Sequence, residues 1–126
     1  MKFTINVVGK IPSKKNRMMI CGRRLVKPKQ VKEFEASLAT AAVCNMKAQN
    51  IGVTDKPVRL HLDVVFGDKR KRDLQNCFGS ICDALNGVVY DDDSQIVVLS
   101  ASKRYQKGEW WYSIYIETLE EAHDEN

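Results

Sequence analysis

The fold is decided by residues 57–87, which read PVRLHLDVVFGDKRKRDLQNCFGSICDALNG. Over residues 57–66, apolar side chains alternate with polar ones, which is the period of a strand with one buried face. Over residues 74–85, apolar side chains recur at helical spacing instead. Asp73 precedes this stripe where an N-cap stands, and Gly87 follows it where a helix commonly ends. The stretch therefore predicts a strand, a basic loop and a short helix.

The chain before this stretch predicts a strand, a basic loop and a long helix. Apolar and polar residues alternate up to Gly9, where the first strand ends. Residues 11–29 are basic and contain two prolines and a glycine, which favours an ordered loop with room for a small hairpin over residues 18–26. A helix begins near Pro28, and its apolar stripe consists of Val31, Phe34, Leu38, Ala41, Ala42 and Met46.

The sequence after residue 87 predicts two more strands. Residues 95–102 include four consecutive apolar residues and are expected to form a buried strand, and residues 110–118 form another. The short connection between them predicts that they pair as a hairpin. The acidic tail over residues 119–126 is expected to be frayed.

The predicted order is β-α-β-α-β-β. It favours an α+β fold with a mixed β-sheet and two main helices. With 126 residues, the chain is long enough for a single domain, residues 1–126, and too short for two ordinary ones.

Composition narrows the class of protein. Hydrophobic residues make up 44% and charged residues 29%, as in a water-soluble globular domain. There is neither an apolar run of about 20 residues nor a signal-peptide pattern, so we expect no membrane association and a cytoplasmic location. The four cysteines form no C-x-x-C pair and are expected to be buried thiols.

Basic residues are clustered within a net charge of +4. Residues 1–32 contain no Asp or Glu, and residues 69–72 are all basic. Clustered cations favour a nucleic-acid partner, because binding releases counterions from the polyanion; the alternative is a solvated surface. The candidate DNA contacts are Lys14, Lys15, Arg17, Arg23, Arg24, Lys69, Arg70, Lys71 and Arg72.

Carboxylates next to these cations are the candidates for chemistry. Asp73 directly follows the basic run, and residues 91–93 are three consecutive aspartates in the loop after the second helix. If the strand that starts at Gln95 packs beside that helix, Asp73 and the Asp-rich loop would converge and offer the oxygen ligands that Mg²⁺ requires. The alternative is that Asp73 only caps the helix and the Asp run is a polar turn. His61 lies on the polar side of its strand and is interpreted as an exposed histidine rather than a catalytic one.

Four ordered motifs resemble one known family. The N-terminal loop GKIPSKKNR at residues 9–17 is followed by RDLQN at 72–76, DALNG at 83–87 and DDSQI at 92–96. Together they are similar to the RusA family of Holliday junction resolvases. That resemblance implies a homodimeric, Mg²⁺-dependent endonuclease, with Mn²⁺ as a substitute, that binds four-way DNA junctions in recombination and repair. Such enzymes are often encoded by phages or prophages.

The resemblance also implies roles for residues of the acidic site. The implied metal ligands are Asp73, Asp93, Asp92 and Gln75, and the implied catalytic residues are Asp73, Asp93 and Asn76. Two positions depart from the family pattern. Gln75 stands where the family has a second aspartate, which lowers the expected metal affinity, and Gly79 stands where the family has a lysine.

Three functions therefore stay open. The first is an active junction endonuclease, and the second is a junction-binding protein of the same family whose cleavage is weakened or lost through Gln75 and Gly79. The third is an RNA-binding or protein-binding module unrelated to nucleases. Metal-dependent nicking of a four-way junction separates the first from the second, and preference for a junction over linear duplex separates both from the third.

Overall fold

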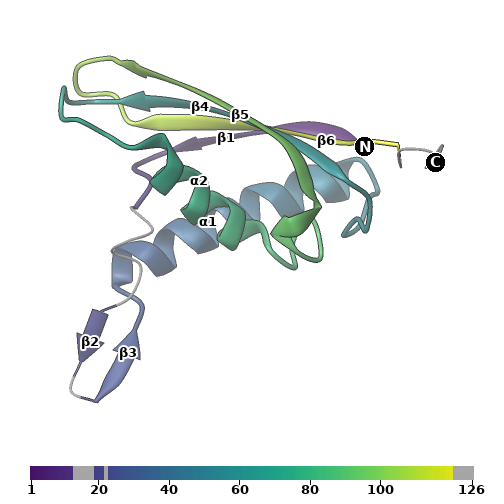
Figure 1. The fold of residues 1–126 in the computed structure, drawn as a ribbon, viewed down its shortest axis with the longest axis horizontal. Coiled ribbons are helices and arrows are strands. Elements are labelled where there is room, and N and C mark those ends of the chain that lie inside the picture. Colours follow the sequence, from purple (N-terminus) through teal and green to yellow (C-terminus); the bar gives the residue numbers. More distant parts are fainter. Residues whose placement is uncertain (13–18, 22, 121–126) are drawn as a thin grey trace.

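A computed structural model describes residues 1–12, 19–21 and 23–120 (Figure 1). The predicted Lys14, Lys15 and Arg17 lie outside these residues, as does the tail from residue 121 onward. The elements are β1 (Lys2–Val8), β2 (Met19–Cys21), β3 (Arg24–Val26), α1 (Lys29–Ala48), β4 (Val58–Phe66), α2 (Leu74–Leu85), the 3-10 turn η2 (Asp93–Gln95), β5 (Ile96–Tyr105) and β6 (Trp111–Thr118).

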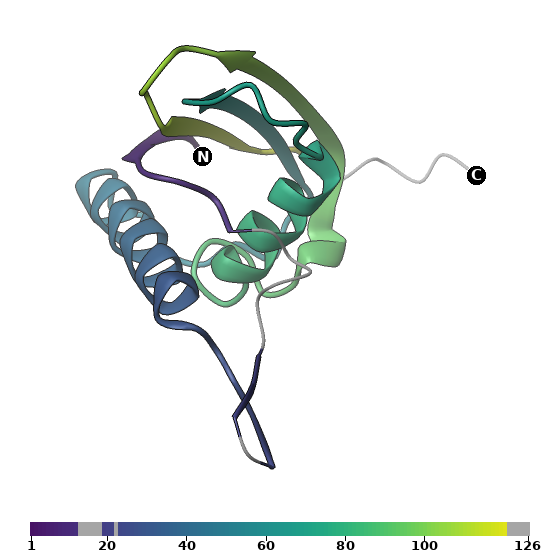
Figure 2. The ribbon, with the colours of Figure 1, turned by 90° about the vertical axis from the view of Figure 1, so that its left-hand side faces the viewer.

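The main sheet has four strands in the order β1-β6-β4-β5, and β2 and β3 form a separate hairpin. Strand β5 runs parallel to β4, whereas β6 is antiparallel to both β1 and β4. Both helices lie on one face of the sheet, and the hairpin projects away from these two layers (Figures 1 and 2). The α+β class, the mixed sheet and the element order are thus confirmed, and the hairpin predicted over residues 18–26 is confirmed as the antiparallel pair Met19–Cys21 and Arg24–Val26; residues 18 and 22 lie outside the described part of the chain.

The predicted hairpin between the last two strands is wrong, because β4 lies between β5 and β6. The connection over residues 106–110 crosses the end of β4 instead. Gln106 N donates to Phe66 O at 2.9 Å, and Gly108 N donates to Gly67 O at 3.0 Å. The helix α2 carries the chain from the end of β4 back to its start, so the next strand pairs parallel with β4.

Strand β5 was also predicted to be buried, and it is an edge strand. Val97 is 60% exposed and Leu99 is 47% exposed. A run of apolar residues indicates a strand but does not reveal which neighbours will cover it, and here β4 alone pairs with β5 among the described residues.

The core lies between the helices and the sheet. Phe34, Leu38 and Met46 of α1 are buried, as the predicted stripe requires, and they belong to one cluster with Ile81 and Leu85 of α2. Fully burying such a side chain stabilises the fold by about 1.5–3 kcal/mol. The cluster thus fixes both helices on the sheet.

The cysteines agree only in part with the expectation of buried thiols. Cys77 and Cys82 are buried, and burial raises the pKa of the Cys77 thiol. Cys44 is exposed, because it lies on the face of α1 turned away from the core. The side chain of Cys21 lies outside what the structure describes.

None of the helices in the described part of the chain is both long enough and apolar enough to cross a membrane.

Candidate functional site

Asp73 stands exposed at the start of α2, where the loop from β4 ends. Its Oδ1 accepts a hydrogen bond from Gln75 N at 2.8 Å, and its Oδ2 accepts one from Asn76 Nδ2 at 3.4 Å. The predicted N-cap is therefore confirmed. The carboxylate remains open to solvent, so capping and a chemical role are compatible.

Cations surround Asp73. A cavity of about 570 Å³ is lined by Lys71, Arg72, Asp73, Leu74, Asn76 and Lys103. Lys103 Nζ donates to Arg72 O at 2.9 Å, which joins β5 to the loop before α2. This arrangement brings a negatively charged oxygen group together with cations that can bind phosphate.

A second hollow of about 450 Å³ continues from this cavity, and its cationic lining consists of Lys69, Arg70, Lys71, Arg72, Lys103 and Arg104. We call these six residues the basic groove. Sequence reasoning identified the four that are consecutive and missed Lys103 and Arg104. They come from β5, which was expected to be buried and to pair with β6 rather than with β4.

Arg72 is the anchor of the basic groove. Its Nη2 lies 2.8 Å from Asp68 Oδ2, and its guanidinium lies 5.6 Å from the ring centroid of Phe66 and 5.1 Å from that of Trp110. The ion pair holds the pKa of the Asp68 carboxyl below its ordinary value. Arg72 therefore fixes the loop against two aromatic rings, while Lys69, Arg70 and Lys71 are exposed beside it.

The predicted partners of Asp73 lie at the other end of α2. Asp93 is half-buried in η2, and Asp92 caps that turn by accepting from Ser94 N at 3.0 Å. Hydrogen bonds from Ser94 lower the pKa of the Asp92 carboxyl. Gln95 Nε2 holds the turn in place by donating to the carbonyl oxygens of Thr54 and Lys56, at 2.9 and 3.0 Å.

The separation follows from the topology. The 12 residues of α2 span about 18 Å. Along β5, the step from Ile96, just after η2, to Lys103, beside Asp73, spans about 23 Å. Within one chain, the structure therefore does not bring Asp73 and Asp93 together. No group of three or more His, Cys, Asp or Glu that could hold a metal ion occurs among residues 1–12, 19–21 and 23–120.

The remaining predicted residues occupy the first turns of α2 and the β2–β3 hairpin. Gln75 is exposed two residues after Asp73, and Gly79 lies one turn further along the helix from it. Arg23 is exposed in the turn between β2 and β3. Arg24 begins β3, but its side chain lies outside what the structure describes.

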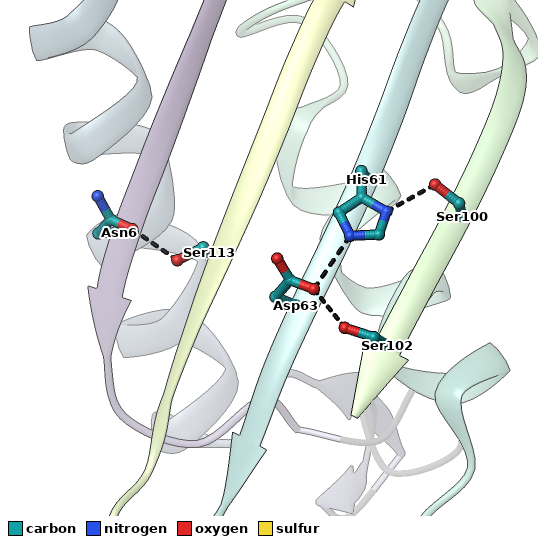
Figure 3. Close-up of polar contacts among 6 residues, drawn as sticks. All are labelled: Asn6, His61, Asp63, Ser100, Ser102 and Ser113. Atoms are coloured by element: carbon teal, nitrogen blue, oxygen red, sulfur yellow. Dashed lines mark hydrogen bonds and ion pairs between the residues drawn. The ribbon is translucent and has the colours of Figure 1, made fainter. Parts of the chain in front are cut away.

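A separate polar network crosses the face of the sheet that the helices leave open (Figure 3). His61 Nδ1 lies 2.6 Å from Ser100 Oγ, and His61 Nε2 lies 3.0 Å from Asp63 Oδ1, which also accepts from the Ser102 hydroxyl. These bonds, led by that of Ser102, lower the pKa of the Asp63 carboxyl. His61 is on the polar face, as predicted, but it has partners on β5 that the sequence did not reveal.

Comparison with known proteins identifies the family. The model of the family described as endodeoxyribonuclease RusA matches residues 8–114. No curated protein matches the chain. The matched region runs from the end of β1 into β6 and includes Asp73, Asp93 and the whole basic groove. The chain therefore belongs to the RusA family of endodeoxyribonucleases, the enzymes that resolve Holliday junctions.

Proposed function

We propose that this protein is a Mg²⁺-dependent endonuclease that resolves four-way DNA junctions as a homodimer. The observation that carries the proposal is the exposed carboxylate of Asp73 in a cavity whose rim includes Lys71 and Lys103. Cations that contact phosphates position a DNA backbone, and a carboxylate among them is suited to hold a metal ion at the bond to be cut. Cytoplasmic recombination and repair of DNA is the expected setting.

The residues of the proposed site have different roles: some bind phosphates and others hold the metal-binding carboxylate in position. Lys69, Arg70 and Lys71 are exposed and bind phosphates of the approaching strand, while Lys103 does so from β5. Asn76 orients the Asp73 carboxylate through its Nδ2 hydrogen bond. When bound, Mg²⁺ or Mn²⁺ supplies a water of lowered pKa and neutralises charge on the phosphodiester.

The residues of a single chain provide too few oxygen ligands for a Mg²⁺ ion. The cavity offers one carboxylate, that of Asp73, among several cations, and Gln75 does not line it, whereas Mg²⁺ in proteins is held by one or two carboxylates together with the substrate phosphates. The nearest support expected from the sequence, Asp93, lies at the far end of α2. We infer that a second chain completes the site.

The edge of β5 is the surface that a second chain would use. This ten-residue strand pairs only with β4 in the described part of the chain, and Val97, Val98 and Leu99 are 60%, 39% and 47% exposed. An edge strand with an exposed apolar stretch and open backbone groups invites pairing with another strand. Two copies related by a two-fold axis present the same edge to each other, antiparallel.

Such pairing carries the second acidic group across the interface. If the two-fold axis passes beside Val98, Ile96 of the partner subunit falls opposite Ser100, and if it passes beside Leu99, opposite Ser102; the partner's η2 then precedes that point on the side of Lys103. Both registers therefore bring the partner's Asp93, which lies in η2 just before β5, toward the end of β5 that bears Lys103. The partner's Asp93 would then stand at the cavity that holds Asp73.

Mixing two inactive variants tests this arrangement. In Asp73→Asn and Asp93→Asn homodimers, every composite site lacks one carboxylate, so neither should nick a junction. In a heterodimer, one site carries both substitutions and the other carries neither. Random exchange makes half of the dimers heterodimers, so a 1:1 mixture should recover about a quarter of the wild-type nicking rate.

If subunit exchange is verified and the mixture does not regain nicking activity, each site takes both carboxylates from one chain, and the composite site is wrong. The control is a mixture of each variant with a doubly substituted chain, which should stay inactive. A Mg²⁺ titration of the wild type checks the metal requirement in the same assay.

Gln75 and Gly79 favour a second candidate, a junction-binding protein that has lost cleavage. If the wild type binds a synthetic junction in preference to duplex but does not nick it with Mg²⁺ or Mn²⁺, this second function holds. Replacing Gln75 by Asp adds a carboxylate beside Asp73 at the start of α2, where the helix dipole favours negative charge. That variant should then lower the metal concentration needed for cleavage, or restore cleavage that the wild type lacks.

A further inference from the structure

We propose that the pocket beside Trp110 binds an unpaired base of the DNA, so that the protein reads the single-stranded character of a junction. This inference rests on the proposed function, because the ligand belongs to the same DNA. The pocket has a volume of about 320 Å³ and lies between the segment after β1, the first turn of α1 and the end of β4. That volume is at the lower end of the range for small-molecule sites.

The pocket combines aromatic rings with cations. Phe66 and Trp110 provide rings, and Lys10, Gln30 and Arg72 provide hydrogen-bond donors around them. Bases bind proteins in this way when they are unstacked, by stacking on an aromatic ring while basic side chains hold the adjacent phosphate. A paired base within a duplex presents no free ring face, so the pocket selects unpaired nucleotides.

The position of Trp110 is constrained through its backbone and its ring. Gly9 N donates to Trp110 O at 2.8 Å, and the Phe66 ring meets the indole edge-on at 6.3 Å and 82°. Gly67 lies so close that a Cβ there would come within 2.4 Å of Trp110 Nε1. A stacking surface fixed on these contacts is ordered before the base arrives, which limits the entropy lost on binding.

Lys10 lies over the Trp110 ring, and a ligand can displace it. Lys10 Nζ lies 4.4 Å from the Trp110 ring centroid, and the Lys10 side chain is exposed. A cation–π contact at an exposed site is weak, so a base can take the place of Lys10, whose ammonium then moves to the phosphate. Arg72 lines the pocket as a second cation, and its buried Nε has no hydrogen-bond partner among the described residues.

The pocket is continuous with the basic groove. Phe66 and Arg72 line both hollows. A strand whose phosphates lie along Lys69, Arg70 and Lys71 therefore passes the mouth of the pocket, and one base at the branch point can enter it.

Trp111 provides a matched control. It is the next residue, but successive side chains of a strand point to opposite faces, so its ring lies on the open face of the sheet with Arg104 at 5.2 Å. Trp110→Leu and Trp111→Leu thus remove equal rings from the two faces.

The experiment measures binding in EDTA, so that cleavage plays no part. The probes are a single-stranded oligonucleotide, a four-way junction with 2-aminopurine at the branch point, and a linear duplex. Trp110→Leu should weaken binding of the single strand and the junction by about tenfold and leave duplex binding unchanged. Trp111→Leu, whose lost ring contacts only Arg104 of the basic groove, should weaken binding of all three probes equally and by less than about twofold. Trp110→Tyr, which keeps a ring, should retain most of the affinity.

The wild type gives a readout that needs no variant: 2-aminopurine fluorescence at the branch point should fall on binding, because the base stacks on the indole. Equal losses from both leucine variants, or unchanged 2-aminopurine fluorescence in a saturated complex, would overturn the pocket. Failure of the proposed nuclease appears separately, as wild-type protein that binds the junction and does not nick it with metal.

Discussion

Asp73 has two roles that substitution can separate. Its Oδ1 caps α2 by accepting from Gln75 N at 2.8 Å, and its exposed charge is the proposed metal ligand. Asn keeps a cap of similar strength and removes only the charge at the helix start, at a cost of about 0.3–1 kcal/mol. Ala removes the cap as well, which adds about 1 kcal/mol. For a domain of this size, 1 kcal/mol lowers the melting temperature by about 3–5 °C.

Three measurements on the two variants check this reasoning. Thermal unfolding should rank wild type above Asp73→Asn and Asp73→Asn above Asp73→Ala. Metal-dependent nicking of a four-way junction should be lost in both. Junction binding in EDTA should be unchanged or tighter in both, because a carboxylate that repels phosphate has been removed. If Asp73→Asn nicks at the wild-type rate, the carboxylate has no role in cleavage and the proposed site is wrong; if binding and nicking fall together with stability, Asp73 is only a cap.

Three further predictions concern residues that support the fold around the site. Gly67→Ala should destabilise the fold by about 1–3 kcal/mol, since its Cβ would come within 2.4 Å of Trp110 Nε1, and urea unfolding measures the loss. Ser80→Ala should weaken DNA binding and lower stability by about 1 kcal/mol, because the buried Ser80 hydroxyl donates to Pro12 O and so ties the N-terminal segment to α2. The Asp63 carboxyl has a pKa lowered from 3.8 in the folded state, so its stabilising contribution is present above that pH and is lost as the pH falls below it. Thermal unfolding from pH 7 to pH 2 should therefore show the difference between wild type and Asp63→Asn shrinking only at the acid end.

Local patterns predicted the elements well, because each pattern reflects burial of one face. The alternation at residues 57–66 and the stripe at 74–85 match β4 and α2 to within one residue, and Asp73 caps α2 as its position indicated. The sequence predicted less well which strands pair with each other. The run at residues 96–99 is as apolar as a buried strand, yet its neighbours leave Val97 and Leu99 exposed.

The missed site residues follow from that pairing. Lys103 and Arg104 reach the basic groove only because β5 lies parallel to β4, and Lys10 and Trp110 meet only because β6 lies between β1 and β4. A usable signal was present. A strand, a helix and a strand in succession commonly form a unit with parallel strands, and applying that rule to residues 57–105 would have placed Lys103 beside the loop before α2.

The β4-α2-β5 unit, with its two parallel strands, explains why the proposed enzyme would need two chains. In a β-α-β unit, the helix starts at one end of the two strands and finishes at the other, so residues just before α2 and just before β5 are necessarily far apart. Asp73 and Asp93 occupy those two positions. A two-fold dimer through β5 reverses the direction of the partner's strand and brings its Asp93 toward this chain's Asp73, and symmetry makes two such sites at once. Two identical sites related by symmetry suit a four-way junction, since paired nicks in opposing strands release two duplexes that each carry one nick, whereas a single nick leaves the branch connected.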